Sequence, residues 1–137
     1  MKTKVDLKTK ALAEYLGIKT NEVIEEMGNY SADGAEYSVY TDDEADASAK
    51  ESILESAWAF NKNFLNAHSK AIAEIDEKTY SKLQEGCESI NQAVLAMIDD
   101  KEHFIEDAIG CDGRGHFISH YDGEENEQNG FYIYRTN

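Results

Sequence analysis

The spacing of apolar residues changes along this chain, and that change restricts the fold more than any other feature of the sequence. Between residues 80 and 97 apolar side chains recur at intervals of three and four, which is typical of an amphipathic helix. Residues 36–40 instead alternate and are rich in tyrosine and valine, which indicates a strand. A chain that uses both periods is expected to have an α+β fold.

Glycine, asparagine and aspartate must separate the elements, because the chain contains no proline. We predict helices over residues 6–16, 21–27, 41–60, 80–97 and 101–109. We predict strands over residues 36–40, 116–121 and 131–134, with a loop over 29–34. The expected fold is a small antiparallel sheet, made of the mid-chain strand and a C-terminal hairpin, covered by three to five helices.

Several local signals support these helices. Gly17 suits a helix C-terminus, since glycine adopts the left-handed conformation without strain. Thr41 and Glu44 have the spacing of a capping box, and Asp76 can cap the helix over 80–97. Gly86 lies inside that helix and costs about 1 kcal/mol relative to alanine, so we expect a close contact or a local weakness there.

The length of 137 residues fits a single domain. Two cysteines without C-x-x-C spacing are too few for a disulfide framework, so we expect reduced thiols, with Cys87 in the core. The N-terminal residues contain no apolar h-region, and no apolar run is long enough to span a bilayer. These features predict a cytoplasmic protein.

The charge of the chain predicts what it binds. There are 28 acidic and 13 basic side chains, a net charge of −15, although the first 20 residues carry five lysines. Nucleic acid and anionic membranes would repel such a protein, since both are bound through lysine and arginine. A basic protein surface would attract it. Residues 12–23 resemble the opening of a helix-turn-helix, but the second helix would be acidic, which argues against DNA binding.

The carboxylates fall into three clusters, which we predict to form the partner-binding surface. Solubility needs a net charge of only about 2–8 in a small domain, so the excess indicates a function or a halophilic source. The predicted contact residues are Asp42, Asp43, Glu44 and Asp46; Asp99, Asp100, Glu102 and Glu106; and Asp122, Glu124, Glu125 and Glu127.

The Gly-rich turn at residues 112–116 offers weaker candidates for chemistry. His116 and His120 would lie about 13 Å apart in a strand, too far to share a metal ion. A helix would allow a site with Cys111 or Asp122, but the apolar pattern favours a strand. We therefore predict no metal, no cofactor and no catalytic residue, and we expect Arg114 to bridge carboxylates or carbonyls near the turn.

Four segments carry a resemblance to a known family. Residues 113–123 and 131–135, together with 37–46 and 56–60, resemble a family of small acidic phage and prophage proteins. The resemblance implies an origin in a mobile element, and no activity or catalytic residue is known for such proteins. Phage proteins that block host nucleases often place carboxylates where phosphates would lie.

Three functions compete at this point. The first is an acidic inhibitor that mimics nucleic acid and binds a host defence complex, in the manner of anti-CRISPR or anti-restriction proteins. The second is an accessory phage protein that dimerises through the apolar seam of residues 80–97. The third is an enzyme whose site would lie around Arg114, His116 and His120. Binding by a mimic should weaken with salt, whereas an apolar helix interface should not.

Overall fold

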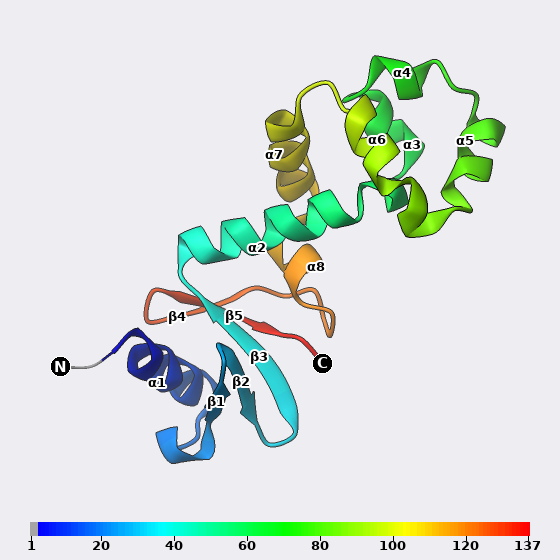
Figure 1. Ribbon diagram of the computed structural model, residues 1–137. Coiled ribbons are helices and arrows are strands. Elements are labelled where there is room, and N and C mark those ends of the chain that lie inside the picture. The colour runs from blue at the N-terminus through cyan, green and yellow to red at the C-terminus, as the bar shows by residue number, and fades with distance from the viewer. Residues whose placement is uncertain (1–2) are drawn as a thin grey trace. The chain divides into compact units, whose positions relative to one another are not determined.

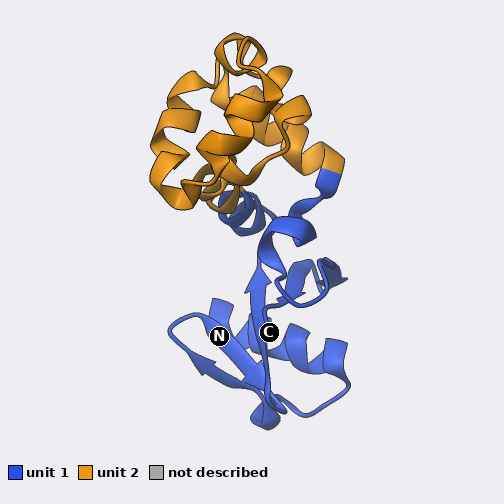
Figure 2. Ribbon diagram, turned by 90° about the vertical axis from the view of Figure 1, so that its right-hand side faces the viewer, with its two compact units in different colours: residues 1–49, 112–137 blue, residues 50–111 orange. Residues whose placement is uncertain are grey.

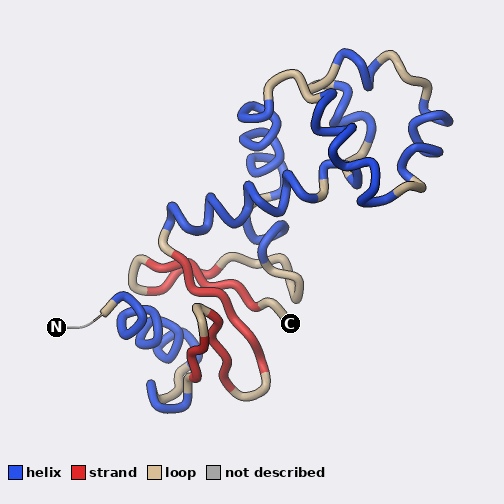
Figure 3. The backbone as a smooth tube through the Cα atoms, viewed as in Figure 1, coloured by secondary structure: helices blue, strands red, loops and turns tan. Residues whose placement is uncertain are grey.

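A computed structural model describes residues 3–137, so Lys2, one of the five N-terminal lysines, lies outside the described residues. Over this range the chain forms eight α-helices and one five-stranded antiparallel sheet (Figures 1 and 3). The predicted α+β class is confirmed. The chain divides into two compact units, residues 1–49 with 112–137 and residues 50–111 (Figure 2). The single domain expected from the length stays a prediction.

The first unit contains the whole sheet, in the strand order β1-β2-β3-β5-β4. The strands are β1 (Ile24–Glu26), β2 (Asn29–Ala32), β3 (Ala35–Tyr40), β4 (Asn126–Gln128) and β5 (Phe131–Arg135). Every neighbouring pair is antiparallel. The predicted mid-chain strand is confirmed as β3, and the last predicted strand as β5.

Helix α1 (Lys4–Leu16) packs against one face of this sheet. A capping box between Thr3 and Asp6 begins it, and Gly17, with a φ of 71°, ends it as the sequence predicted. Alternation along the strands places one set of side chains against the helix. The resulting core consists of Leu12, Tyr30, Ala35, Tyr37, Val39 and Ile133.

The opposite face of the sheet carries Tyr40, Tyr132 and Tyr134, which are paired or neighbours across β3 and β5. The short helix α8 (Arg114–Ile118) contributes Arg114 to this face, where its guanidinium lies 4.7 Å from the Tyr132 ring centre. Gly115 is required in α8, because a Cβ there would lie 2.4 Å from the carbonyl oxygen of Gly123.

The predictions for residues 21–27 and 29–34 were wrong. Only a short 3-10 helix, Thr20–Glu22, forms before the chain enters β1, and β2 replaces the expected loop. Met27 and Gly28 have φ angles of 52° and 86°, which make the two-residue turn that joins β1 to β2. A methionine rarely occupies such a turn, so residues 27 and 28 do not have the sequence typical of a hairpin.

The predicted strand over residues 116–121 was also wrong. This segment is the end of α8 followed by a turn, and the hairpin partner of β5 is β4, from the acidic loop. Asn129-Gly130 forms the hairpin turn. The residues of β4 are all polar, so their pattern does not indicate a strand, and the strand forms by pairing with β5.

The second unit is helical. It contains α3 (Lys62–Asn66), α4 (Lys70–Ala73), α5 (Glu77–Gln84), α6 (Asn91–Met97) and most of α7 (Lys101–Asp112), which confirms the predicted helix over 101–109. Helix α2 (Asp42–Glu55) crosses the boundary between the units. Its predicted continuation to residue 60 is a separate 3-10 turn, Ala57–Ala59. The fully buried side chains include Ile53, Leu65, Ile72, Val94 and Phe104.

A single helix over residues 80–97 does not form. Helix α5 ends at Gln84, a 3-10 helix follows at Cys87–Ile90, and α6 begins at Asn91. The break occurs at Gly86, where a close contact or a local weakness was expected. A Cβ at Gly86 would lie 2.8 Å from Ile90 Cγ2. Cys87 has a φ of 51° and is exposed, so its predicted place in the core was wrong. The apolar seam is therefore divided between two helices.

None of the helices between residues 3 and 137 is long and apolar enough to cross a membrane.

Candidate functional site

Arg114 gathers carboxylates from two distant segments of the first unit. Its Nη1 donates to Oδ1 of Asp42 at 2.8 Å and to Oδ1 of Asp46 at 2.9 Å. Its Nε donates to Oε1 of Glu125 at 2.8 Å. Nη1 also lies 3.1 Å from the carbonyl oxygen of Asp42. The prediction that Arg114 bridges carboxylates is thus confirmed, and two of the predicted acidic clusters meet here. We call Arg114, Asp42, Asp43, Asp46 and Glu125 the Arg114 cluster.

The guanidinium lies beneath the carboxylates that it binds. The Arg114 side chain is 12% exposed, whereas those of Asp42 and Asp46 are 65% and 59% exposed. Burial lowers the pKa of Arg114, but its bonds to Glu125 and the aspartates raise it further, so the net shift is upward. The cation is therefore permanent, and it fixes the carboxylates while leaving their outer sides to solvent.

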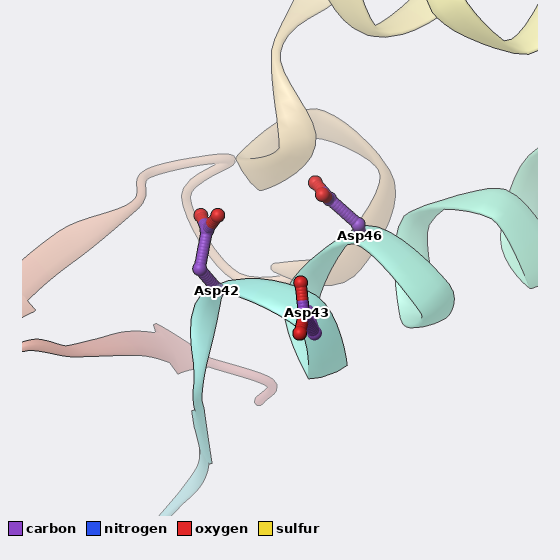
Figure 4. Close-up of side chains that lie close together, drawn as sticks. All are labelled: Asp42, Asp43 and Asp46. Carbon is purple, nitrogen blue, oxygen red and sulfur yellow. The ribbon is translucent and has the colours of Figure 1, made fainter.

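Helix α2 brings the three aspartates of the cluster together. They lie in its first two turns, and Asp42 and Asp46 are one helical turn apart and face α8 (Figure 4). Carboxylate oxygens of Asp42, Asp43 and Asp46 lie within 4.8 Å of one another. A metal ion could span that distance, but Arg114 already supplies the cation to two of them. Four carboxylates and one guanidinium leave this cluster a net charge of −3.

Tyr134 positions the fourth carboxylate. This side chain is fully buried, packs against Tyr40 with ring centres 5.9 Å apart, and donates its hydroxyl hydrogen to Oε1 of Glu125. Burial and the bond to Glu125 raise the pKa of Tyr134 well above its usual value of 10.0. The hydroxyl therefore remains a donor at physiological pH. The sequence did not identify Tyr134 as a site residue. Its position in the predicted strand over residues 131–134 was the one indication of its burial.

Glu44 stabilises the fold, because its carboxylate bonds to groups within the first unit. Its Oε1 accepts bonds of 2.8 Å from Lys8 Nζ and from the backbone N–H of Thr41, as the predicted capping box requires. Lys4 Nζ lies 3.0 Å from Oε2. Burial raises the pKa of Glu44, but the bonds from Lys8 and Thr41 outweigh it and lower the pKa to about 2. The nearly buried Lys8 was another residue that sequence reasoning missed.

The other predicted residues of the first unit lie in the loop after α8 and in β4. Ser119 Oγ lies 2.9 Å from Oδ1 of Asp122 and 2.6 Å from the carbonyl oxygen of Arg135. Glu127 bonds to the hydroxyl of Tyr132 and is the main cause of that group's raised pKa. Glu124 is exposed. These residues extend the negative surface beyond the Arg114 cluster.

The predicted residues of the second unit are exposed, and three of them hold local structure. Asp99 accepts a bond of 3.0 Å from the backbone N–H of Lys70. Asp100 accepts one of 3.2 Å from the N–H of His103 at the start of α7. Glu102 pairs with Lys50 at 3.0 Å, and Glu106 is exposed on the same helix. Among the ion pairs of residues 3–137, none joins two of these four carboxylates to a single cation, as Arg114 does in the first unit.

The candidates for metal binding and catalysis do not come together. His116 lies in α8 with its ring against Phe117, and α8 ends before His120. Cys111 Sγ lies 3.7 Å from Oδ1 of Asp107. Within residues 3–137 the three aspartates of α2 form the one group whose atoms are close enough to share a metal ion. The predicted separation of His116 and His120 assumed that residues 116–121 form a strand, and this assumption was wrong.

Sequence reasoning also missed a contact between a buried histidine and a carboxylate in the second unit. His68 Nε2 lies 2.7 Å from Oδ2 of Asp107, and the histidine side chain is 2% exposed. The ring of His68 packs edge-on against Phe104 and His103. The hydrogen bond from His68 lowers the pKa of Asp107. Since 39 residues separate the pair, no local pattern could have predicted it.

No protein-family model, curated protein or solved structure matches this chain. The resemblance to phage proteins therefore stays a prediction.

Proposed function

We propose that the protein is an acidic inhibitor that binds the nucleic-acid-binding surface of a host defence protein. The Arg114 cluster carries this proposal. Its largely buried guanidinium holds three carboxylates, those of Asp42, Asp46 and Glu125, and two of them are more than half exposed. In this proposal the chain comes from a phage or prophage and acts in the cytoplasm of a bacterial host. It binds a protein, without a catalytic step, a cofactor or direct contact with nucleic acid.

Preorganisation is the physical reason for choosing this cluster. Duplex DNA presents one phosphate charge per roughly 1.7 Å of its axis, so a mimic must hold negative charges close together. Free carboxylates would repel one another and lose side-chain entropy on binding. Arg114 lowers both costs, because it fixes Asp42, Asp46 and Glu125 before a partner arrives.

The charge of each unit supports the same proposal. The first unit carries 16 acidic and 7 basic side chains, a net charge of −9, and the second carries 12 and 6, a net charge of −6. Two of the N-terminal lysines, Lys4 and Lys8, pair with Glu44 and so add no free positive charge to this surface. Both units would therefore be attracted to a basic partner.

A pull-down from bacterial lysate at low and at high salt tests the proposal, with partners identified by mass spectrometry. We expect a nuclease or another nucleic-acid-binding protein at low salt, displaced by DNA or RNA. Recovery of the protein alone, or of a partner insensitive to salt, would contradict the proposal.

The alternative is a phage accessory protein that dimerises through residues 80–97. The seam is divided between α5 and α6, with the break at Gly86. Sedimentation at rising concentration and high salt separates the two functions. A salt-insensitive dimer would favour the accessory role, and a monomer would favour the inhibitor.

A further inference from the structure

The hairpin of β1 and β2 exposes apolar side chains at one edge of the sheet. Strand β1 is the terminal strand of the order β1-β2-β3-β5-β4. Ile24 in this strand is 60% exposed, and Met27 in the turn is 99% exposed. An unpaired edge with exposed apolar residues is a surface on which another chain can add a strand.

Met27 is unfavourable for folding at its position. Its φ of 52° lies in the left-handed region, which a two-residue hairpin turn fills with asparagine or glycine. A methionine side chain there also gains nothing from burial. Neither the turn conformation nor burial therefore accounts for a methionine at this position.

A recess with two carboxylates lies beside this edge. It has a volume of about 140 Å³ and is lined by Ile24, Glu26, Asn29, Tyr30, Ser31 and Glu36. The strand register places Ile24, Ser31 and Glu36 on the face of the sheet away from α1. No ion pair between residues 3 and 137 engages Glu26 or Glu36.

We propose that this hairpin binds an extended segment of a partner protein that carries a lysine or arginine beside an apolar side chain. The segment pairs with the free edge of β1, since alternation along an antiparallel strand directs the backbone of Glu25 away from β2. Its cation enters the recess between Glu26 and Glu36. Its apolar side chain contacts Ile24 and Met27.

Charge decides against a second copy of this chain as the occupant. Two β1 edges paired with each other would bring Glu25 and Glu26 of one copy close to those of the other. Like charges across paired strands are destabilising. A basic segment meets the same carboxylates with opposite charge. This site uses no residue of the Arg114 cluster, so it stands or falls separately from the proposed function.

Amide NMR spectra of the full chain, titrated with short peptides, test the site. The probe is an acetylated and amidated peptide of alternating lysine and valine. The controls are a glutamate–valine peptide and a lysine–glycine peptide of equal charge. We expect the lysine–valine peptide to shift the amides of residues 24–31 and Glu36, and to bind more tightly than both controls. Shifts centred on Asp42–Asp46, or equal binding of the lysine–glycine peptide, would overturn the proposal.

Two variants separate binding from folding. Met27→Asn suits the turn, so we expect an unchanged or higher Tm together with about fivefold to tenfold weaker binding of the lysine–valine peptide. Glu36→Gln should weaken binding by a similar factor. Leu83→Asn, at another exposed apolar side chain, is the control and should leave binding unchanged. Unaltered affinity in Met27→Asn, or hairpin shifts that depend on protein concentration without peptide, would contradict the site.

Discussion

Nη1 of Arg114 lies 2.8 Å from Oδ1 of Asp42, although 72 residues separate the two in the chain. This bond joins the start of α2 to the start of α8 within the first unit. The same guanidinium binds Asp46 and Glu125. One buried cation therefore determines both the packing of α8 and the arrangement of the exposed carboxylates.

Replacing Arg114 should destabilise the first unit. Arg114→Met removes four hydrogen bonds and leaves three carboxylates without their cation, so we expect a loss of about 2–4 kcal/mol in the free energy of unfolding. Arg114→Lys keeps the charge but loses the forked geometry of the guanidinium. Its free energy of unfolding should lie between those of the unaltered protein and Arg114→Met. Urea unfolding measures the difference. Lys10→Met, at an exposed lysine, is the control. An equal loss of stability in Lys10→Met and Arg114→Met would contradict the role of Arg114.

Acid should weaken the fold through Glu44. The pKa of Glu44 in the folded chain is about 2, below its ordinary value of 4.5. The unfolded chain therefore takes up this proton first as the pH falls. The stabilisation is fully present above about pH 4.5 and is lost as the pH falls toward 2.

Urea unfolding at several pH values measures this loss. Glu44→Gln should flatten the dependence of unfolding free energy on pH between 4.5 and 2. Glu51→Gln changes an exposed carboxyl in the same helix and should leave the slope as it is. An unchanged slope in Glu44→Gln would show that another group causes the acid sensitivity.

Two glycines should respond to alanine with opposite signs. A Cβ at Gly115 would meet the backbone of residues 123–125, at 2.4 Å from the Gly123 carbonyl oxygen, so Gly115→Ala should cost about 1–3 kcal/mol. Gly110 lies within α7 with open space around it, so Gly110→Ala should stabilise by about 0.5–1 kcal/mol. Thermal unfolding of both variants is the measurement. A Gly115→Ala variant as stable as the unaltered protein would contradict the packing of α8.

Asn91 should be essential to the second unit. Its side chain is buried, donates to the carbonyl oxygen of Leu54 at 2.8 Å and accepts from the N–H of Trp58 at 3.1 Å. It thus satisfies the backbone where α2 ends. Asn91→Ala leaves both groups without this partner and should cost about 2–4 kcal/mol in urea unfolding. The exposed neighbour Gln92 offers the control, and Gln92→Ala should cost less than about 0.5 kcal/mol.

Local patterns in the sequence predicted local structure well. Gly17, the pair Thr41 and Glu44, and Asp76 all cap helices as expected, because a cap depends on residues only three or four positions apart. The long helix over 80–97 failed for a local reason as well. Apolar spacing cannot show that Cys87 takes a φ of 51°, which divides the seam.

The rest of the fold could not be predicted from local patterns, because it depends on pairing between residues that are far apart in the chain. Strand β4 consists of polar residues and exists because β5 pairs with it, so no pattern within 126–128 could reveal it. The same holds for the candidate site. The sequence indicated that Arg114 bridges carboxylates and named Asp42, Asp46 and Glu125 as surface residues. That these belong to one cluster depends on bonds across 68 and 72 residues.

The most direct test of the account compares two triple variants in the lysate pull-down at low salt. Asp42→Asn, Asp43→Asn and Asp46→Asn together remove three charges from the Arg114 cluster. Glu51→Gln, Glu55→Gln and Glu74→Gln remove three exposed charges elsewhere. The account predicts that the first variant loses the nucleic-acid-binding partner while the second retains it. Equal recovery by both variants would contradict a role for the cluster in binding.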